Sequence, residues 1–406
     1  MSEQNTPAAA APEPPAWRQV FAKIVNGSTL TSILSVVLAL IIGAILIAAA
    51  DSDVQEKASW FFYQPGDLFG AIWDTVAGAY SALFQGAVFN IDRSYTVQDF
   101  FAPLWDSIAT STPLIFAGLG LGMGFRAGLF NIGAQGQIIL GGTLCGFLGY
   151  ALHLPPGIHM ALCVLGAFVG GAFWGFIPGI LRAQTGANEV IVTIMLNSTA
   201  IYLLGWLLTQ PSFKQTGSIN PISPPVDETA RFPAFFGTPI NLGFLLALAA
   251  AFGVWWLMER STLGFSIRAV GANPEAARTA GMSVPAATVW VMTLAGGLAG
   301  LAATSQLMSR VSDQLTTDVA STFGFDAITV ALLGRSKPAG IVAAGLLFGG
   351  LRAGGYTMQA FTSTPIDVIL VLQSVIVLFI AAPPLVRAIF RLPDPERRRK
   401  VKEVAA

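Results

Sequence analysis

Residues 29–50 read TLTSILSVVLALIIGAILIAAA and contain no charged side chain. A helix needs about 20 mostly apolar residues to cross the hydrocarbon core of a bilayer, so this stretch predicts a transmembrane helix. The first 27 residues of the chain are rich in alanine and proline and lack the short basic start and short apolar core of a cleavable signal peptide. We therefore expect this first helix to be retained.

The composition of the whole chain is also that of a membrane protein. Its 406 residues are 54% hydrophobic and only 11% charged, with a mean hydropathy of +0.65, whereas a soluble domain carries about 25% charged residues. The 22 basic and 22 acidic residues balance, and no basic stripe indicates nucleic-acid binding. The two cysteines and two histidines show no metal-ligand spacing. We expect an all-α polytopic membrane protein without a cofactor or metal.

Apolar segments recur along the chain and predict about ten transmembrane helices. They lie near 29–50, 106–125, 131–153, 157–181, 189–209, 240–258, 286–308, 323–334, 338–351 and 366–386. The eighth and ninth are short, so 323–351 forms either two spans or a re-entrant hairpin.

The distribution of basic residues predicts that both termini are cytoplasmic. With the N-terminus inside, the inner side receives Arg18, Lys23, Arg126, Arg182, Arg260, Arg268, Arg278, Arg335, Lys337, Arg387, Arg391, Arg397, Arg398, Arg399, Lys400 and Lys402. The outer side receives only Lys57, Arg93, Lys214, Arg231, Arg310 and Arg352.

Three regions follow from this topology. Residues 1–27 are expected to be a disordered cytoplasmic tail, 28–390 the membrane domain, and 391–406 a basic cytoplasmic tail. Within the membrane domain, apolar residues at helical spacing over 66–91, interrupted by Asp67 and Asp74, predict an amphipathic helix on the outer surface. The alternative for 66–91 is a further span.

Two segments hint at internal duplication. FNIGAQGQIILG (130–141) and FGFDAITVALLG (323–334) match at four of twelve aligned positions and run in opposite directions across the predicted membrane. Inverted repeats are common in transporters, which favours two inverted units of five helices. Chance likeness in a biased composition is the alternative.

The chain shows no pattern for chemistry of its own. It lacks the G-x-x-x-x-G-K-[ST] motif of ATP-binding loops. Few ionisable residues fall inside predicted spans, and the polar groups near them are mostly amides, which both donate and accept hydrogen bonds. A path lined in this way suits an uncharged polar solute, whereas the alternative is hydrogen bonding between helices. The candidates are Asn131, Gln135, Gln137, Asn188, Glu189, Asn197 and Asp326.

The longest predicted inner connection is 259–283, ERSTLGFSIRAVGANPEAARTAGMS. Within it, PEAARTA (274–280) begins with proline, a favoured first residue of a helix, and Gly281 can end that helix. A short helix at the inner surface is what a membrane domain needs to respond to a cytosolic motor. The alternative is an ordinary solvated loop.

Four stretches together resemble the permeases of nucleoside-type ABC importers, within the ribose and branched-chain amino-acid permease superfamily. They are GFRAGLFNIGAQGQIILGG (124–142), GANEVIVTIMLN (186–197), LGFSIRAVGANPEAARTAGM (263–282) and FGFDAITVALLGRSKPAG (323–340). The resemblance covers about 100–385. It departs at Gln135, where the family pattern commonly has an acidic residue.

The resemblance implies the transport subunit of an importer in the bacterial cytoplasmic membrane. Its expected partners are a cytosolic ABC ATPase, a second and often non-identical permease, and a periplasmic or lipid-anchored binding protein. The implied solutes are nucleosides; a ribose-like sugar is the alternative, and a secondary transporter is a more distant one. The segment matching the family's coupling region gives candidate ATPase contacts at Gly271, Asn273, Pro274, Glu275, Ala276, Arg278 and Gly281.

Overall fold

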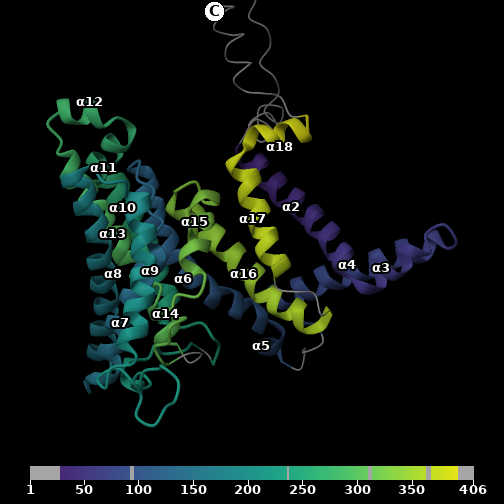
Figure 1. Ribbon diagram of the computed structural model, residues 1–406, viewed down its shortest axis with the longest axis horizontal. Helices are drawn as coiled ribbons and strands as arrows, with labels where there is room; N and C mark the ends of the chain where they lie inside the picture. Colours follow the sequence, from purple (N-terminus) through teal and green to yellow (C-terminus); the bar gives the residue numbers. More distant parts are fainter. Residues whose placement is uncertain (1–27, 92–95, 236, 310–312, 363–366, 392–406) are drawn as a thin grey trace, which may run out of the picture. The chain divides into compact units, whose positions relative to one another are not determined.

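A computed structural model describes residues 28–91, 96–235, 237–309, 313–362 and 367–391, and most of these residues are helical (Figure 1). No β-strand occurs in these ranges apart from one isolated bridge between Ala234 and Asn241. This agrees with the predicted all-α class. The predicted tails at 1–27 and, beyond Arg391, at 392–406 lie outside the described residues.

The first half of the chain comprises α2 (Ser28–Ala50), α3 (Ser52–Ser59), α4 (Pro65–Ala87), α5 (Val97–Phe100), α6 (Ala102–Arg126), α7 (Ala134–Ala151), α8 (Ile158–Thr185) and α9 (Glu189–Leu207). The second half comprises the 3₁₀ turn η1 (Glu228–Ala230), α10 (Leu242–Arg260), α11 (Thr262–Ala272), α12 (Pro274–Thr279), α13 (Val284–Leu301), α14 (Thr304–Leu307), α15 (Phe323–Leu333), α16 (Pro338–Thr362), α17 (Asp367–Ala381) and α18 (Pro383–Ile389).

Seven helical segments in the described ranges are long and apolar enough to cross a membrane. They are Ile33–Ala50, Ala102–Arg126, Ile158–Thr185, Glu189–Leu207, Leu242–Arg260, Val284–Leu307 and Pro338–Thr362. The other predicted spans correspond to α7, α15 and α17, which are shorter or less apolar. At 11 residues, α15 is only about 16 Å long, about half the thickness of the hydrocarbon core.

One predicted boundary is wrong. The ninth segment does not end at 351, because α16 continues to Thr362. Arg352, assigned to the outer side as a residue beyond that segment, lies inside the helix, where its guanidinium pairs with Asp326. The paired charge allows the helix to continue through a position where an isolated arginine would be costly.

The predicted amphipathic helix at 66–91 forms as α4 over Pro65–Ala87. Its small residues pack against α16: a β-carbon added to Gly86 would collide with Thr357, and one added to Gly354 would collide with the carbonyl oxygen of Leu83. This face of α4 is therefore covered by another helix. The position of α4 on the outer surface stays a prediction.

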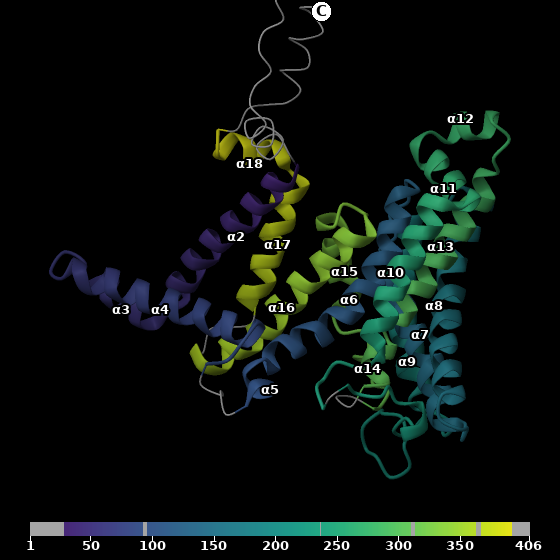
Figure 2. The ribbon, with the colours of Figure 1, turned by 180° about the vertical axis from the view of Figure 1, so that it is seen from behind.

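The chain divides into two compact units, Gly43–Gln373 and a smaller one formed by Met1–Ile42 with Ser374–Ala406. Within the larger unit, α8 and α13 lie side by side (Figures 1 and 2). Their backbones touch, because a β-carbon at Gly171 would collide with the carbonyl oxygen of Gly296, and one at Gly175 with that of Met292. Glycines spaced along one helix face allow such close approach in membranes.

A second close crossing joins α6 to α16. A β-carbon at Gly349 would lie 2.7 Å from the carbonyl oxygen of Ser107, and one at Gly345 would lie 2.6 Å from Ile115. α6 also contacts α13, because a β-carbon at Gly120 of α6 would lie 2.5 Å from the carbonyl oxygen of Ala295 of α13. α6 and α13 thus form the middle of the larger unit.

The glycine crossing makes a stability prediction. Gly171→Ala adds a methyl group where none fits, and overpacking of this kind costs about 1–3 kcal/mol. We expect a lower thermal unfolding midpoint for the detergent-purified protein. The matched control is Gly205→Ala in α9, where a β-carbon meets no atom within 4 Å, and where alanine favours helix by about 1 kcal/mol. Equal midpoints for the two variants would contradict the crossing.

Candidate functional site

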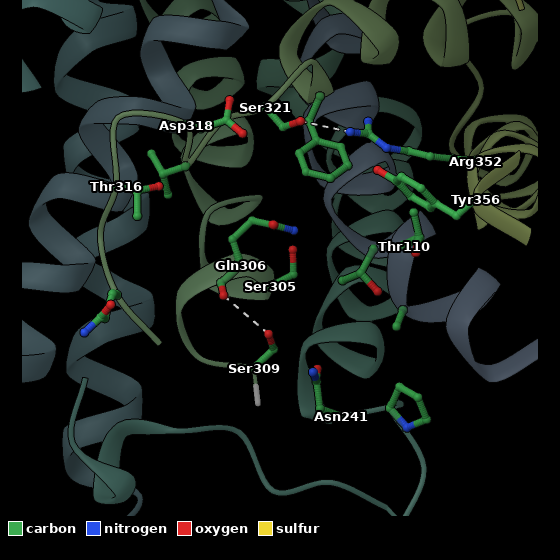
Figure 3. Close-up of a pocket in the computed structure, with 16 residues that line it drawn as sticks. Thr110, Asn241, Ser305, Gln306, Ser309, Thr316, Asp318, Ser321, Arg352 and Tyr356 are labelled. Atoms are coloured by element: carbon green, nitrogen blue, oxygen red, sulfur yellow. Dashed lines mark hydrogen bonds between the residues drawn. The ribbon is translucent and has the colours of Figure 1, made fainter. Parts of the chain in front are cut away.

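A polar cavity of about 360 Å³ opens in the larger unit between α6, α14, α16 and the segment leading into α15 (Figure 3). Its walls carry hydroxyl and amide side chains together with two charged residues. The lining residues are Ala109, Thr110, Thr112, Pro239, Asn241, Ser305, Gln306, Ser309, Gln314, Thr316, Asp318, Val319, Ser321, Phe323, Arg352 and Tyr356.

Arg352 is held in the cavity wall by several partners. Its guanidinium donates to Asp326 Oδ2 at 3.0 Å and to the hydroxyls of Thr322 and Ser321 at 3.0 and 2.9 Å, and it lies 4.4 Å over the ring of Phe323. The Arg352 and Asp326 side chains are only 16% and 17% exposed. The predicted path residue Asp326 therefore stands behind the wall, as the counter-ion of a lining residue.

The N-terminal ends of α7 and α15 meet beside this wall. Gln135 donates from Nε2 to the carbonyl oxygen of Ser321 at 2.5 Å and accepts at Oε1 from the backbone N–H of Gly324 at 3.1 Å. A β-carbon at Gly324 would collide with the backbone of Gln135. The two segments that resemble each other in sequence are thus in direct contact.

Three other predicted path residues hold the irregular backbone just before α7. Asn131 bonds the Gln137 side chain at 3.1 Å, and Asn197 accepts from the N–H of Gly136 and donates to the carbonyl of Ile132, both at 2.9 Å. Non-helical backbone at membrane depth must find internal partners, and these amides supply them.

The last two candidates lie at the start of α9. Asn188 caps the helix by accepting from the N–H of Val190 at 2.9 Å. Glu189 is buried, pairs with Arg182 and accepts from the N–H of Phe130 at 3.3 Å. None of the seven predicted path residues is among the described residues that line the cavity, and a role for them in a solute path stays a prediction.

At another part of the larger unit, α11 and α12 form a short helical hairpin that confirms the helix predicted at 274–280. Asn273 caps α12 by accepting from the N–H groups of Glu275 and Ala276 at 3.0 and 3.1 Å, and Pro274 is its first residue. Gly281 follows with φ +81°, a left-handed conformation that favours glycine. The proposed loop over 259–283 is thus largely helical.

The two faces of α12 differ. Ala277 is buried with Val270 and Ala287, so this side of the helix is fixed to the membrane domain. Glu275 and Arg278 form a 3.1 Å ion pair with side chains 78% and 63% exposed. The hairpin therefore offers charged groups on a supported helix.

The hairpin is attached to the end of α6 by two means. A β-carbon at Gly271 would collide with the carbonyl oxygen of Arg126, so the two backbones are in contact. Glu259 at the end of α10 then bridges Arg126 of α6 at 2.6 Å and Arg268 of α11 at 3.0 Å. Since α6 also carries Thr110 and Thr112, one helix runs from the hairpin to the cavity.

Comparison with known proteins defines the family. Residues 104–381 match the family described as the permease component of branched-chain amino acid transport systems. This chain is a member of that family. The permease is accordingly a transport subunit and a multi-pass protein of the cytoplasmic membrane.

Individual relatives agree with this assignment. The permease is 35% identical over 320 residues to the guanosine ABC transporter permease protein NupP of Bacillus subtilis, covering 77% of this chain and 88% of the relative. It is 34% identical over 283 residues to the nucleoside ABC transporter permease protein NupB of Lactococcus lactis, covering 67% and 77%. It is also 34% identical over 281 residues to the glucose ABC transporter permease protein TsgB13 of Haloferax volcanii, covering 66% and 73%. No solved structure matches the permease.

Sequence reasoning missed most of the cavity of the permease. Gln306 lies in the predicted span 286–308 but was not among the candidates, and the hydroxyls of Thr110, Ser305 and Ser309 gave no signal, because serine and threonine are common in membrane helices. Arg352 was visible only as a charge in an apolar region. Such a charge marks a functional position by default, and this was the available clue.

The ion bridge at Glu259 makes a prediction about local stability. Glu259→Gln removes both ion pairs, each worth up to about 1 kcal/mol at this partial exposure. We expect the backbone amides of 262–279 to exchange hydrogen up to about 30-fold faster, the factor that corresponds to about 2 kcal/mol, measured by mass spectrometry on the purified permease.

The control for this experiment is Glu56→Gln in α3, an exposed glutamate that lies outside the bridge. Unchanged exchange over 262–279 in Glu259→Gln would show that the hairpin is held without the ion bridge.

Proposed function

We infer that the permease is the membrane subunit of an ABC importer for nucleosides. The observation that carries this inference is the α11–α12 hairpin, which offers an exposed Glu275–Arg278 pair and is attached to a helix lining a polar cavity. The relatives named as guanosine and nucleoside permeases support the solute class.

The expected partners follow from this function. A cytosolic ABC ATPase supplies the energy, since this chain carries no ATP-binding loop motif, and a binding protein delivers the solute at the outer face. A second permease subunit, identical or not, completes the path. The residues proposed to contact the ATPase are those of the hairpin: Gly271, Asn273, Pro274, Glu275, Ala276, Arg278 and Gly281.

For the arrangement in the membrane, ten helices in two inverted units of five, with both termini cytoplasmic, fit the function best. The contacts support this pairing: α6 packs on α16 as α13 packs on α8, and α15 contacts α6 as α7 contacts α13. Exchanging α6, α15 and α16 for α13, α7 and α8 maps these contacts onto each other, as expected for inverted repeats.

A role in transport is also proposed for the buried amides. Asn131, Gln137 and Asn197 support the backbone before α7, and Gln135 ties α7 to the cavity wall. These residues therefore act behind the path and fix its shape. Asn188, Glu189 and Asp326 support it in the same way through a helix cap and two ion pairs.

A simple sugar is the second candidate solute, favoured by the glucose permease among the relatives. The polar cavity suits either solute, because its hydroxyl and amide side chains can both donate and accept hydrogen bonds.

The deciding experiment measures uptake of labelled guanosine, adenosine, ribose and glucose by cells that express the permease with its neighbouring transport subunits. We expect nucleoside uptake that requires the ATPase and survives collapse of the ion gradients. Uptake of sugar alone would keep the importer and change the solute. Uptake that stops with the gradient and needs no ATPase would identify a secondary carrier and overturn the proposal.

The hairpin is tested by Glu275→Ala and Arg278→Ala. Because interface hot spots cost about 2 kcal/mol or more on truncation, we expect ATP-driven uptake to fall by about tenfold or more. Solute binding to the isolated binding protein should not change. The matched control is Glu56→Ala, which removes an exposed acid from α3. Full uptake in both hairpin variants would remove the hairpin from the coupling role.

A further inference from the structure

The polar cavity holds two charged side chains in different situations. Arg352 is compensated by Asp326 at 3.0 Å and also bonds Thr322 and Ser321. Asp318 is exposed, and its carboxylate has no hydrogen-bond or ion-pair partner among the described residues. Counted over the described lining residues, the cavity has one uncompensated negative charge.

This distribution selects against phosphorylated solutes. A free arginine in a cavity would attract phosphate strongly, but here the guanidinium is occupied by a carboxylate and two hydroxyls. The exposed carboxylate of Asp318 repels a second negative charge, and it does so more strongly than in bulk water because the cavity lies within protein.

The same carboxylate suits a vicinal diol. Ionised aspartate only accepts hydrogen bonds, and its two oxygens can accept from two neighbouring donors. Acidic side chains bind ribose hydroxyls in this manner in dinucleotide-binding folds. The hydroxyl of Ser305 and the amide of Gln306 face the same space (Figure 3) and can serve further polar atoms of the solute.

One aromatic ring remains available for a planar base. The guanidinium of Arg352 covers the face of the Phe323 ring, and Phe323 is only 5% exposed. Tyr356 is 54% exposed and lies one helical turn from Arg352 on α16, bordering the cavity (Figure 3). Stacking of a base on an aromatic side chain is worth about 1–3 kcal/mol, and the cavity volume of about 360 Å³ is within the range of small-molecule sites.

We propose that this cavity binds an uncharged ribonucleoside during its passage, with Asp318 accepting hydrogen bonds from the ribose 2′ and 3′ hydroxyls and Tyr356 stacking on the base. This assignment rests on the proposed function. It adds which part of the solute the cavity recognises: a vicinal diol joined to an aromatic base, without phosphate.

The test uses the complete importer, with ATPase, both permease subunits and binding protein, reconstituted in proteoliposomes with ATP. Uptake of labelled guanosine is compared with uptake of labelled 2′,3′-dideoxyguanosine for the wild type, Asp318→Asn, Tyr356→Ala and Tyr356→Phe. Because the same binding protein feeds every complex, a change in the ratio between the two solutes reports on the permease. Asp67→Asn, an exposed acid on α4, is the matched control.

Asp318→Asn is expected to lower guanosine uptake about tenfold, as for loss of hydrogen bonds to a charged group, and to leave dideoxyguanosine uptake unchanged. Tyr356→Ala is expected to lower the uptake of both solutes about tenfold. Tyr356→Phe is expected to retain the uptake of both. Guanosine monophosphate should not compete with guanosine uptake by the wild type. Thermal unfolding of each variant verifies that it is folded.

Three results would overturn the assignment. If Asp318→Asn lowers the uptake of guanosine and of dideoxyguanosine equally, the carboxylate does not recognise the diol. Full guanosine uptake in that variant would show that Asp318 is not part of the site. Full uptake in Tyr356→Ala would remove the stacking ring. In each of these cases the wild type still imports guanosine, so the proposed function stands; a wild-type complex that imports no nucleoside would overturn both.

Discussion

Backbone contact between helices is the constraint on which the rest of this permease depends. Lipid tails are as apolar as leucine, so helices in a membrane gain little from hiding apolar side chains and associate through close packing instead. Here α8 and α13 touch across Gly171 and Gly296, and α6 meets α13 at Gly120. These contacts fix the central helices, and the central helices carry both the cavity and the attachment of the hairpin.

The two functional regions are connected by one helix, α6. α6 contributes Thr110 and Thr112 to the cavity, and its last residue, Arg126, is bonded to Glu259 and lies against Gly271. A displacement of the hairpin therefore moves the end of a helix of 25 residues, about 38 Å long. The Arg126–Glu259 ion pair holds the end of this helix, and the close contact at Gly120 holds its middle.

The sequence predicted the helices well and the cavity poorly, for different physical reasons. Apolar runs of about 20 residues are required by the bilayer thickness, so the segments containing α6, α8 and α13 could be located directly. The helix at 274–280 was likewise encoded locally by Pro274 and Gly281. The end of α16 was not, because the charge of Arg352 looked like a boundary until its partner Asp326, 26 residues away, was known.

The candidate amides show a similar limit. Asn131, Gln137 and Asn197 were predicted as path residues because they are polar groups in an apolar chain, but their orientation depends on which backbone groups lack partners. The cavity, in contrast, combines residues from 109 to 356, and six of its sixteen lining residues are serines or threonines with no distinctive spacing. Only the tertiary structure brings them together.

Gln135 has a consequence for how the junction of α7 and α15 responds to protons. Its amide donates to the Ser321 carbonyl and accepts from the Gly324 N–H simultaneously, and it does so at every pH because an amide does not titrate. An acidic residue at this position could make both bonds only in its protonated form, since a carboxylate has no hydrogen to donate. With glutamine, these two bonds between α7 and the start of α15 do not depend on the protonation state of residue 135.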